Sequence, residues 1–263
     1  MKNILDKIIA QKRREVDALK QTKSIQQLSI GKYFEQPVFS LKQNLLKGTA
    51  SGIIAEFKRM SPSKGVINEN AKPEEVALGY KKAGVSGMSV LTDTQFFGGS
   101  FQDFSIVRKA VDIPLLRKDF IIDEYQVYET KSYGADVMLL IAANLEVNQC
   151  HQLAAKAKEL GLEVLLELHV EEELDHISDN IDVVGINNRN LKTFKVDLEH
   201  SIKLAEKIPN TFVKIAESGI SNPANIRMLK QHGFKGFLIG ETFMKTNDPA
   251  KACADFIKEL TVS

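Results

Sequence analysis

The chain has 263 residues, of which 43% are hydrophobic and 26% charged, a composition typical of a soluble globular protein with a sizeable core. Its 35 lysines and arginines nearly balance 34 aspartates and glutamates, and the net charge of +1 gives no indication of a nucleic-acid or acidic-membrane partner. No apolar run reaches the roughly 20 residues that span a bilayer, and residues 1–9 carry charges too early for a secretory signal, so we expect a cytoplasmic protein.

Residues 3 to about 22 are predicted to form an amphipathic helix, because apolar residues such as Ile8 and Val16 recur near helical spacing. The charged run at residues 12–15 is expected to face water. A basic transit peptide is the alternative interpretation, but acidic residues within the segment argue against it. The stretch from residue 21 to about 51 is weakly periodic, and we expect a linker with short covering helices.

From residue 52 onward, short apolar runs alternate with helical segments. The near-continuous hydrophobicity of the runs is typical of parallel strands buried on both faces. Eight such units in about 210 residues favour a closed barrel over an open doubly wound sheet, and no Gly-x-Gly-x-x-Gly motif indicates a dinucleotide-binding sheet. The expected strands are residues 52–57, 87–91, 114–119, 136–141, 163–168, 182–187, 211–216 and 236–240.

The predicted fold is therefore α/β, a (β/α)8 TIM barrel with an extra N-terminal helix. We expect one barrel domain over residues 1–263, in which residues 1–51 form the N-terminal helical extension. In a barrel of this kind, the active site lies at the carboxyl ends of the strands and in the loops that follow them.

Polar and ionisable residues follow six of the predicted strands at that end. A charge where a strand meets solvent is common, but agreement among six strand ends is not. Lysines and glutamates that converge in a largely dry mouth perturb each other's pKa values, as acid–base catalysis requires. The residues are Glu56, Lys58, Thr92, Asp93, Lys118, Asp119, Glu167, His169, Asn187, Asn188, Arg189, Glu217 and Ser218.

Three loops predict a site for a phosphorylated substrate. Barrels often bind phosphate with the loops after strands seven and eight. Here these loops carry Gly219, which lets backbone amides approach an anion, and Gly240 with Glu241, which can open a short helix. Glu241 must then point away from the dianion. The loop at residues 61–65 adds hydroxyls and a lysine, and we hypothesise that it closes over the substrate.

Other constellations give weaker signals. The five histidines and the two cysteines lack metal-ligand spacing, so no metal site is predicted. Cys150 and Cys253 lie away from the predicted strand ends and are interpreted as buried or half-buried free thiols. The aromatic run at residues 96–101 is compatible with packing under a loop or with a wall for a planar substrate, and the local sequence slightly favours packing.

Several segments together resemble the indole-3-glycerol phosphate synthase family. The first are IAEFKRMSPSKG at residues 54–65, LTD at 91–93, FFGGS at 96–100 and LRKDFIIDEYQ at 116–126. In the expected order there follow ELH at 167–169, GINNRNL at 185–191, ESGI at 217–220 and LIGE at 238–241. The likeness covers nearly the whole chain. Phe57 replaces the aliphatic residue usual in the family and is expected to face the surrounding helices.

The resemblance implies a cofactor-free reaction of a small phosphorylated anthranilate–sugar substrate, 1-(2-carboxyphenylamino)-1-deoxyribulose 5-phosphate. The products are indole-3-glycerol phosphate, carbon dioxide and water. By the family pattern, Lys118 protonates the sugar ketone, with a pKa lowered by a partly desolvated, cation-rich site. Lys58 either holds the substrate carboxylate or is the acid in the later dehydration, and Glu167 and Glu56 are the candidate bases.

The same resemblance implies a substrate-binding set. Asn187 and Arg189 orient the substrate, and Arg189 can pair with a carboxylate. The aromatic pocket is lined by Phe97 and Phe120. Ser218 supports the sugar hydroxyls, and the phosphate is held by Ser61, Gly219 and Gly240 with the amides around them, including that of Glu241.

Three other functions stay open. Phosphoribosylanthranilate isomerase, another phosphosugar barrel enzyme, lacks the long N-terminal helix and the Glu-x-Lys and Lys-Asp-Phe segments found here. A catalytically inactive phosphosugar-binding module is disfavoured by the intact set of Glu56, Lys58, Lys118 and Glu167. A scaffold for a neighbouring enzyme is not demanded by any sequence feature, and no obligate protein partner is expected.

Overall fold

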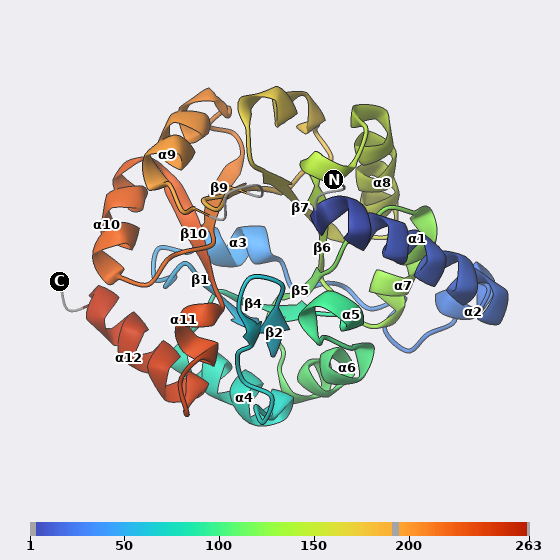
Figure 1. Cartoon of the computed structure of the whole chain (residues 1–263), viewed down its shortest axis with the longest axis horizontal. Coiled ribbons are helices and arrows are strands. Elements are labelled where there is room, and N and C mark those ends of the chain that lie inside the picture. Colours follow the sequence, from blue (N-terminus) through green and yellow to red (C-terminus); the bar gives the residue numbers. More distant parts are fainter. Residues whose placement is uncertain (1–3, 191–194, 262–263) are drawn as a thin grey trace.

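The computed structural model describes residues 4–190 and 195–261. Eight parallel strands form a closed barrel in the order β1-β10-β9-β8-β7-β6-β5-β4, and helices surround it (Figure 1). The predicted TIM barrel is confirmed, and every expected strand is present with small shifts at its ends. The strands are β1 (Ile53–Phe57), β4 (Gly87–Leu91), β5 (Leu115–Lys118), β6 (Val137–Ile141), β7 (Glu163–Leu168), β8 (Val183–Asn187), β9 (Val213–Glu217) and β10 (Phe234–Ile239).

Helices follow most strands and cover the outside of the barrel, while a 3-10 segment takes that place after β7. The long outer helices are α4 (Pro73–Ala83), α6 (Phe101–Ala110), α7 (Glu124–Ser132), α8 (Val147–Glu159), α9 (Leu198–Lys207), α10 (Pro223–Gln231) and α12 (Pro249–Thr261). The shorter segments are α5 (Thr94–Phe97), η1 (Ala142–Asn144), η2 (Glu171–His176) and α11 (Glu241–Met244).

Alternate residues of each strand face two different cores, because successive side chains of a strand point to opposite sides. Ile54, Leu116 and Leu165 belong to the cluster that fills the barrel interior. Ile53 and Phe57 belong to the larger cluster between the strands and the outer helices. Phe57 therefore faces the helices, as expected from the sequence. The same alternation decides which polar residues at the strand ends turn inward.

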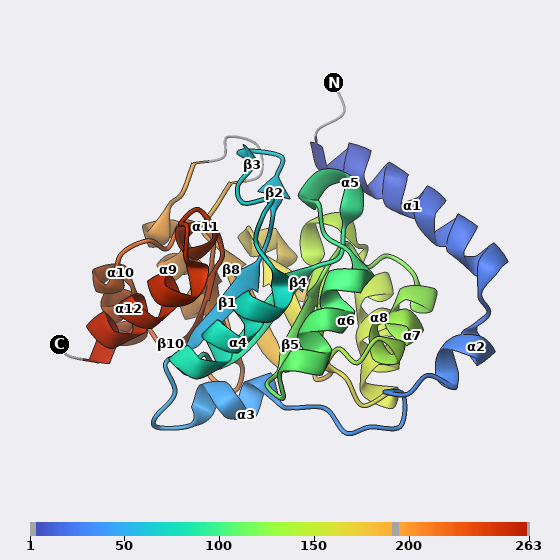
Figure 2. The same cartoon turned by 90° about the horizontal axis from the view of Figure 1, so that it is seen from below.

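The N-terminal segment covers both ends of the barrel. Helix α1 (Ile4–Thr22) lies at the end that also carries α5, and α3 (Leu41–Leu46) lies at the opposite end (Figure 2). Leu41 and Leu45 join the interior cluster from below. With α2 (Ile25–Ser29), these elements confirm the predicted helix and the linker with short helices. Residue 3, where the first helix was expected to begin, lies outside the described residues, as does Leu191.

One charged residue of α1 is buried, which corrects the expectation that residues 12–15 face water. Lys12 is 4% exposed, and its Nζ lies 3.0 Å from Asp93 Oδ2 and 2.9 Å from Asp119 Oδ1. Burial alone lowers the pKa of Lys12, but Asp119 and then Asp93 outweigh it and raise this pKa. A buried ammonium persists here because partners far along the chain compensate its desolvation.

Both cysteines are buried free thiols, as predicted. Burial raises the pKa of Cys150 and of Cys253 to about 12, so neither is a thiolate near neutral pH. Within residues 4–190 and 195–261, no helix combines the length and the apolarity needed to cross a membrane.

Candidate active site

A cavity of about 530 Å³ opens at the carboxyl ends of the barrel strands. Its wall includes the hairpin of β2 (Met60–Ser61) and β3 (Gly65–Val66), the start of α11, and residues of α1 such as Ile8. The structure brings together every residue that the sequence assigned to catalysis or substrate binding. Lining the cavity are Glu56, Lys58, Ser61, Phe97, Lys118, Phe120, Glu167, Asn187, Arg189, Ser218, Gly219, Gly240 and Glu241.

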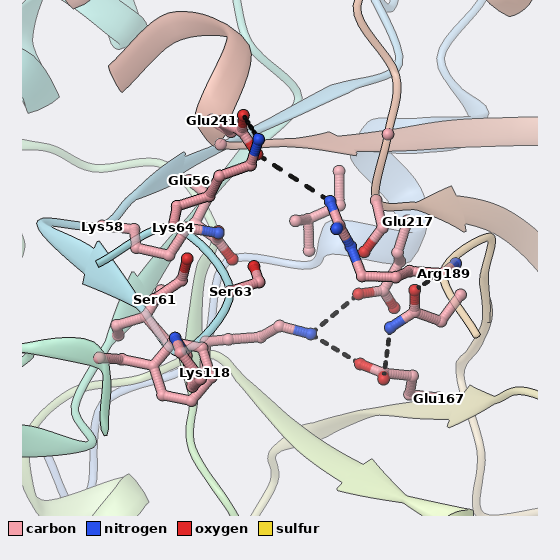
Figure 3. A pocket seen from close by; sticks show the side chains of 18 of the residues that line it. Glu56, Lys58, Ser61, Ser63, Lys64, Lys118, Glu167, Arg189, Glu217 and Glu241 are labelled. Atoms are coloured by element: carbon pink, nitrogen blue, oxygen red, sulfur yellow. Dashed lines mark hydrogen bonds and ion pairs between the residues drawn. The ribbon is translucent and has the colours of Figure 1, made fainter. Parts of the chain in front are cut away.

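Lys118 lies between two glutamates at the centre of this cavity (Figure 3). Its Nζ is 2.7 Å from Glu167 Oε2 and 2.9 Å from Glu217 Oε2. Asn187 Nδ2 donates a 2.9 Å hydrogen bond to the other oxygen of Glu167. These side chains meet because neighbouring strands present them in register, with Asn187 paired to Glu217 across β8 and β9. The cluster is a buried cation held by two carboxylates, one of them further fixed by an amide.

The electrostatics of Lys118 contradict one expectation from the sequence. Burial alone lowers the pKa of Lys118, but Glu167 and then Glu217 outweigh it and raise this pKa above its ordinary value. The expectation of a lowered pKa in a cation-rich site was wrong, because the groups that turn toward Lys118 are carboxylates. Lys118 is therefore fully protonated in the free protein, as a proton donor must be.

The two glutamates beside Lys118 differ in their pKa values. Burial raises the pKa of Glu217 to about 7; the cation of Lys118 opposes this shift and the charge of Glu167 adds to it. For Glu167 burial acts in the same direction, but Lys118 and then His169 outweigh it and hold its pKa well below the ordinary value. Glu167 is thus ionised at neutral pH, and Glu217 exchanges a proton there.

Glu217 is the functional residue that the sequence analysis missed: it stood among the strand-end residues without a role. A sequence signal was present in the glycines that face the same interior. A Cβ on Gly185 would lie 2.2 Å from Glu217 Oε1, and a Cβ on Gly240 would lie 2.5 Å from Glu56 Oε1. Both glycines lack the side chain that would otherwise fill the space of a buried carboxylate.

A second lysine–glutamate pair lies at the end of β1. Lys58 Nζ is 2.5 Å from Glu56 Oε1, and Ser89 Oγ donates a 3.4 Å hydrogen bond to the other Glu56 oxygen. The Lys58 side chain is 18% exposed, whereas that of Glu56 is 3% exposed. The cavity therefore holds two lysine–carboxylate clusters, the pair at the end of β1 and the Lys118 cluster spread over β5, β7 and β9.

The loop after β9 has an unusual backbone. Ser218 has φ 68 and Gly219 has φ 70, and Ser218 is the one non-glycine residue with positive φ within the described ranges. Such conformations are sparse and gather at functional sites. Asn188 Nδ2 donates a 2.8 Å hydrogen bond to the Ser218 carbonyl and holds this turn. Both turn residues line the cavity.

Cations and one carboxylate meet at the mouth beside this turn (Figure 3). Glu241 Oε1 is 3.4 Å from Lys64 Nζ, and Glu241 Oε2 is 3.9 Å from Arg189. Glu241 thus lies on the cavity wall, turned toward two positive side chains. That Glu241 points away from a bound phosphate stays a prediction. The two cations nevertheless provide positive charge where an anionic substrate group would enter.

The aromatic run does more than pack under a loop. The rings of Phe97 and Phe120 lie 6.0 Å apart between centroids, tilted by 39°, and both half-buried residues face the cavity. They provide an apolar wall next to Lys118.

Three of the strand-end residues lie outside the cavity wall: Thr92, Asp93 and Asn188. Thr92 and Asp93 belong to a buried charge network beneath α1. Thr92 Oγ1 donates a 2.7 Å hydrogen bond to Asp119, while Asp93 pairs with Lys12 and caps α5. Asn188 instead supports the Ser218 turn.

Ionisable groups that converge at the carboxyl end of a closed eight-stranded barrel occupy the place where enzymes of this fold carry out their chemistry. The chain thus falls in the class of TIM-barrel enzymes. A family model described as "Indole-3-glycerol phosphate synthase" matches residues 5–256. The chain belongs to the indole-3-glycerol phosphate synthase family.

Individual relatives agree with this assignment. A protein named indole-3-glycerol phosphate synthase from Bacteroides thetaiotaomicron is 54% identical, over 99% of this chain and 100% of the relative. A protein of the same name from Bordetella pertussis is 41% identical, over 98% of this chain and 100% of the relative.

Solved structures show likeness in fold alone. The 3-hexulose-6-phosphate synthase from Salmonella typhimurium superposes with a TM-score of 0.59 at 12% identity, covering 80% of this chain and 99% of that one. The tryptophan synthase subunit alpha from Legionella pneumophila also gives a TM-score of 0.59 at 12% identity, covering 84% and 96%.

Proposed function

We propose that this protein converts 1-(2-carboxyphenylamino)-1-deoxyribulose 5-phosphate into indole-3-glycerol phosphate, carbon dioxide and water. The observation that carries the proposal is the cluster of Lys118 between Glu167 and Glu217 inside the cavity. Family membership supports the same reaction. Side chains of the chain supply every proton donor and acceptor that the steps need, so the proposed reaction uses no cofactor. We place the reaction in the cytoplasm.

In the first step, the aromatic carbon that bears the carboxylate attacks the sugar ketone, and carbon dioxide leaves. The ketone oxygen then needs a proton. We assign this proton to Lys118, whose raised pKa keeps it charged until the oxygen becomes basic. Glu167 holds the ammonium in place, and Asn187 donates to Glu167 and fixes that carboxylate. The aromatic wall of Phe97 and Phe120 accommodates the planar ring.

In the second step, the hydroxyl leaves as water and the ring loses one proton to become an indole. We assign this dehydration to the pair on β1, with Lys58 as the acid and Glu56 as the base. Their 2.5 Å separation supports this division, because the proton that Glu56 removes can return directly to Lys58. Arg189 is then left to pair with the substrate carboxylate before it departs.

The phosphate end of the substrate is assigned to the side of the cavity opposite the aromatic wall. The left-handed turn of Ser218 and Gly219 brings backbone close to the cavity, while Ser61 and Gly240 line it from neighbouring loops. Lys64 supplies positive charge. We also assign the Ser218 hydroxyl to the sugar, and the hairpin at residues 61–65 to closure over the bound substrate.

Indole fluorescence tests the proposal directly, because the chain has no tryptophan and gives a low background. We expect indole emission to increase when the substrate is added to wild-type protein, and to stay at background when it is added to Lys118→Ala. Lys214→Ala is the matched control: Lys214 is also a buried lysine on a barrel strand, but its Nζ donates to the carbonyls of Ala205 and Ile208 outside the cavity. This control should retain activity.

Two other outcomes overturn the proposal in different ways. Saturable binding of the substrate to wild type without emission identifies a binding module. Absence of binding means that the chain acts on a different substrate. Protease sensitivity of residues 61–65 measures closure separately, since closure requires protection of this hairpin when a substrate analogue binds.

A further inference from the structure

His169 lies between two carboxylates, next to the Lys118 cluster. Its Nε2 is 3.2 Å from Glu167 Oε1, and its Nδ1 is 3.9 Å from Glu173 Oε2. Glu173 belongs to η2 and accepts hydrogen bonds from the backbone amides of His169 and Val170. His169 is 8% exposed, whereas the side chain of Glu173 is 12% exposed and lies nearer the surface segment of η2. The contacts thus run in the order Lys118, Glu167, His169, Glu173, and the first three of these residues line the cavity.

The imidazole ring of His169 lacks a well-aligned hydrogen-bond partner within the described residues. Both ring nitrogens are buried, and neither has a hydrogen bond of good geometry within the described residues. Buried polar atoms are normally paired, so an unpaired ring between two acceptors calls for an explanation. A ring that is locked to one carboxylate holds that carboxylate in place. A ring that is close to two and aligned with neither can pair with each in turn by a small rotation.

The proposed reaction creates a need for proton transfer from solvent. The departing water carries two protons added to the ketone oxygen, the ring gives up one, and the carboxylate leaves as carbon dioxide without one. Each turnover therefore takes up one proton from solvent. The Lys58–Glu56 pair recovers its own proton, whereas Lys118 ends the cycle neutral, next to Glu167.

We infer that His169 and Glu173 form a proton relay that restores Lys118 from solvent after each turnover. Glu173 passes a proton to Nδ1 of His169, and the ring releases the proton on Nε2 to Glu167 Oε1. Rotation of the protonated carboxyl group then brings this proton to Lys118, which lies 2.7 Å from Oε2. No bond to carbon forms or breaks in this sequence. His169 is a positioning residue: it delivers a proton to Glu167 and does not itself react with the substrate. The inference rests on the proposed function.

The charges around the ring are compatible with this transfer. Burial lowers the pKa of His169, but Glu167, Glu173 and Glu217 outweigh it and raise this pKa above its ordinary value, which favours proton uptake by the ring. The other titratable neighbour is His200 of α9, whose Nε2 contacts the carbonyl oxygen of His169 at 2.8 Å and not its ring.

Comparison of single and multiple turnovers of His169→Gln tests the relay. With enzyme in excess, we expect indole to form at nearly the wild-type rate, because Lys118 starts protonated. With substrate in excess and dilute buffer, kcat should fall on the order of tenfold and recover as imidazole is added, since a small diffusible acid replaces the ring. His200→Gln is the control and should match wild type in both regimes.

Glu173→Gln is a second variant for the case that His169→Gln does not fold, and it should show the same pattern. An equal loss in single and multiple turnovers means that His169 only holds Glu167 in place, which overturns the relay. An unchanged kcat in dilute buffer, or a loss that imidazole does not restore, also overturns it. If wild type itself forms no indole, the proposed function fails; every other outcome leaves that function intact.

Discussion

Two buried lysines of this protein have closely similar surroundings and different consequences. Lys12 lies 2.8–3.0 Å from three carboxylates and Lys118 lies 2.7–2.9 Å from two, and in both cases these neighbours raise the lysine's pKa. Around Lys12, the carboxylate of Asp119 also accepts from Thr92 and pairs with Arg117. Each cluster has one carboxylate oxygen without a hydrogen bond of good geometry within the described residues, Asp93 Oδ2 beside Lys12 and Glu217 Oε1 beside Lys118. Lys118 lines the cavity and Lys12 does not, so access to the cavity distinguishes the reactive ion cluster from the structural one.

The two clusters meet at consecutive residues. Lys118 faces the cavity, while Asp119 turns its carboxylate to Lys12 and Arg117. Because successive residues at a strand end point in opposite directions, one short segment anchors α1 on one side and carries the proposed acid on the other. Substitutions in the two clusters should therefore separate loss of activity from loss of stability.

The largest effect is expected from Glu167→Gln, which should lower kcat by at least 10²-fold, because an amide neither holds the Lys118 ammonium nor passes a proton to it. Glu163→Gln is the matched control. Glu163 faces the same interior from the other end of β7, where it accepts from Ser40 and from the amide of Lys42. Initial rates of indole emission measure both variants. Similar losses of activity in both variants would mean that the two carboxylates of β7 support the structure of the barrel and that Glu167 has no specific role in catalysis.

Lys12→Met should instead cost stability, by about 3 kcal/mol, because it leaves the buried Asp93 without its lysine and leaves Asp119 paired with Arg117 alone. Lys20→Met provides the comparison on the same helix: Lys20 pairs with Asp123 at 2.7 Å, with side chains 40% and 32% exposed, so its loss should cost under about 1 kcal/mol. Urea unfolding measures both free energies. Equal costs would show that burial of Lys12 carries no extra stabilisation.

Glu217→Gln should change how stability depends on pH. Glu217 binds its proton more tightly in the folded than in the unfolded protein, so its contribution is full below pH 4.5 and is lost as pH rises through about 7. The variant lacks this loss. Relative to wild type, it should gain about 3 kcal/mol in free energy of unfolding between pH 4 and pH 8. Parallel curves for the two proteins would contradict the raised pKa.

The smallest effect is expected at the turn after β9. A Cβ on Gly219 would lie 2.5 Å from a methyl of Val196, so Gly219→Ala should raise KM several-fold by about 1 kcal/mol of distortion at the phosphate side. Gly84→Ala is the control, because Gly84 ends α4 away from the cavity and has φ +83 with nothing within 4 Å of the added Cβ. It carries the same backbone strain without the clash. Steady-state kinetics that show no difference between the two variants would remove the turn from substrate binding.

Much of this arrangement could be predicted from the sequence because burial leaves a local signature. Strands covered on both faces read as unbroken apolar runs, so all eight barrel strands were found. The polar ends of those runs located the cavity wall, since strand ends of a barrel converge in space. The strands and the cavity wall could thus be predicted from short stretches of consecutive residues.

The errors concern partners that lie far apart in the chain. Helical periodicity treats every lysine as polar, so Lys12 was predicted to face water. The sequence around residue 12 contains no sign of its two aspartate partners, which lie about 80 and 107 positions away. The direction of the Lys118 pKa shift depended on which charges turn toward it. Glu217 lacked a role for the same reason, although Gly185 opposite it was visible in the sequence.

Gly185 and Gly240 have a consequence for redesign of this barrel. Gly185 lies on β8 and Gly240 directly follows β10, and at each position the absent side chain leaves volume for one carboxylate of the cavity. Transplanting the acids alone into a related scaffold with larger side chains at these two positions would force them outward or distort the strands. A graft of this site therefore requires glycines at these two positions first, because only then is there volume for the two carboxylates.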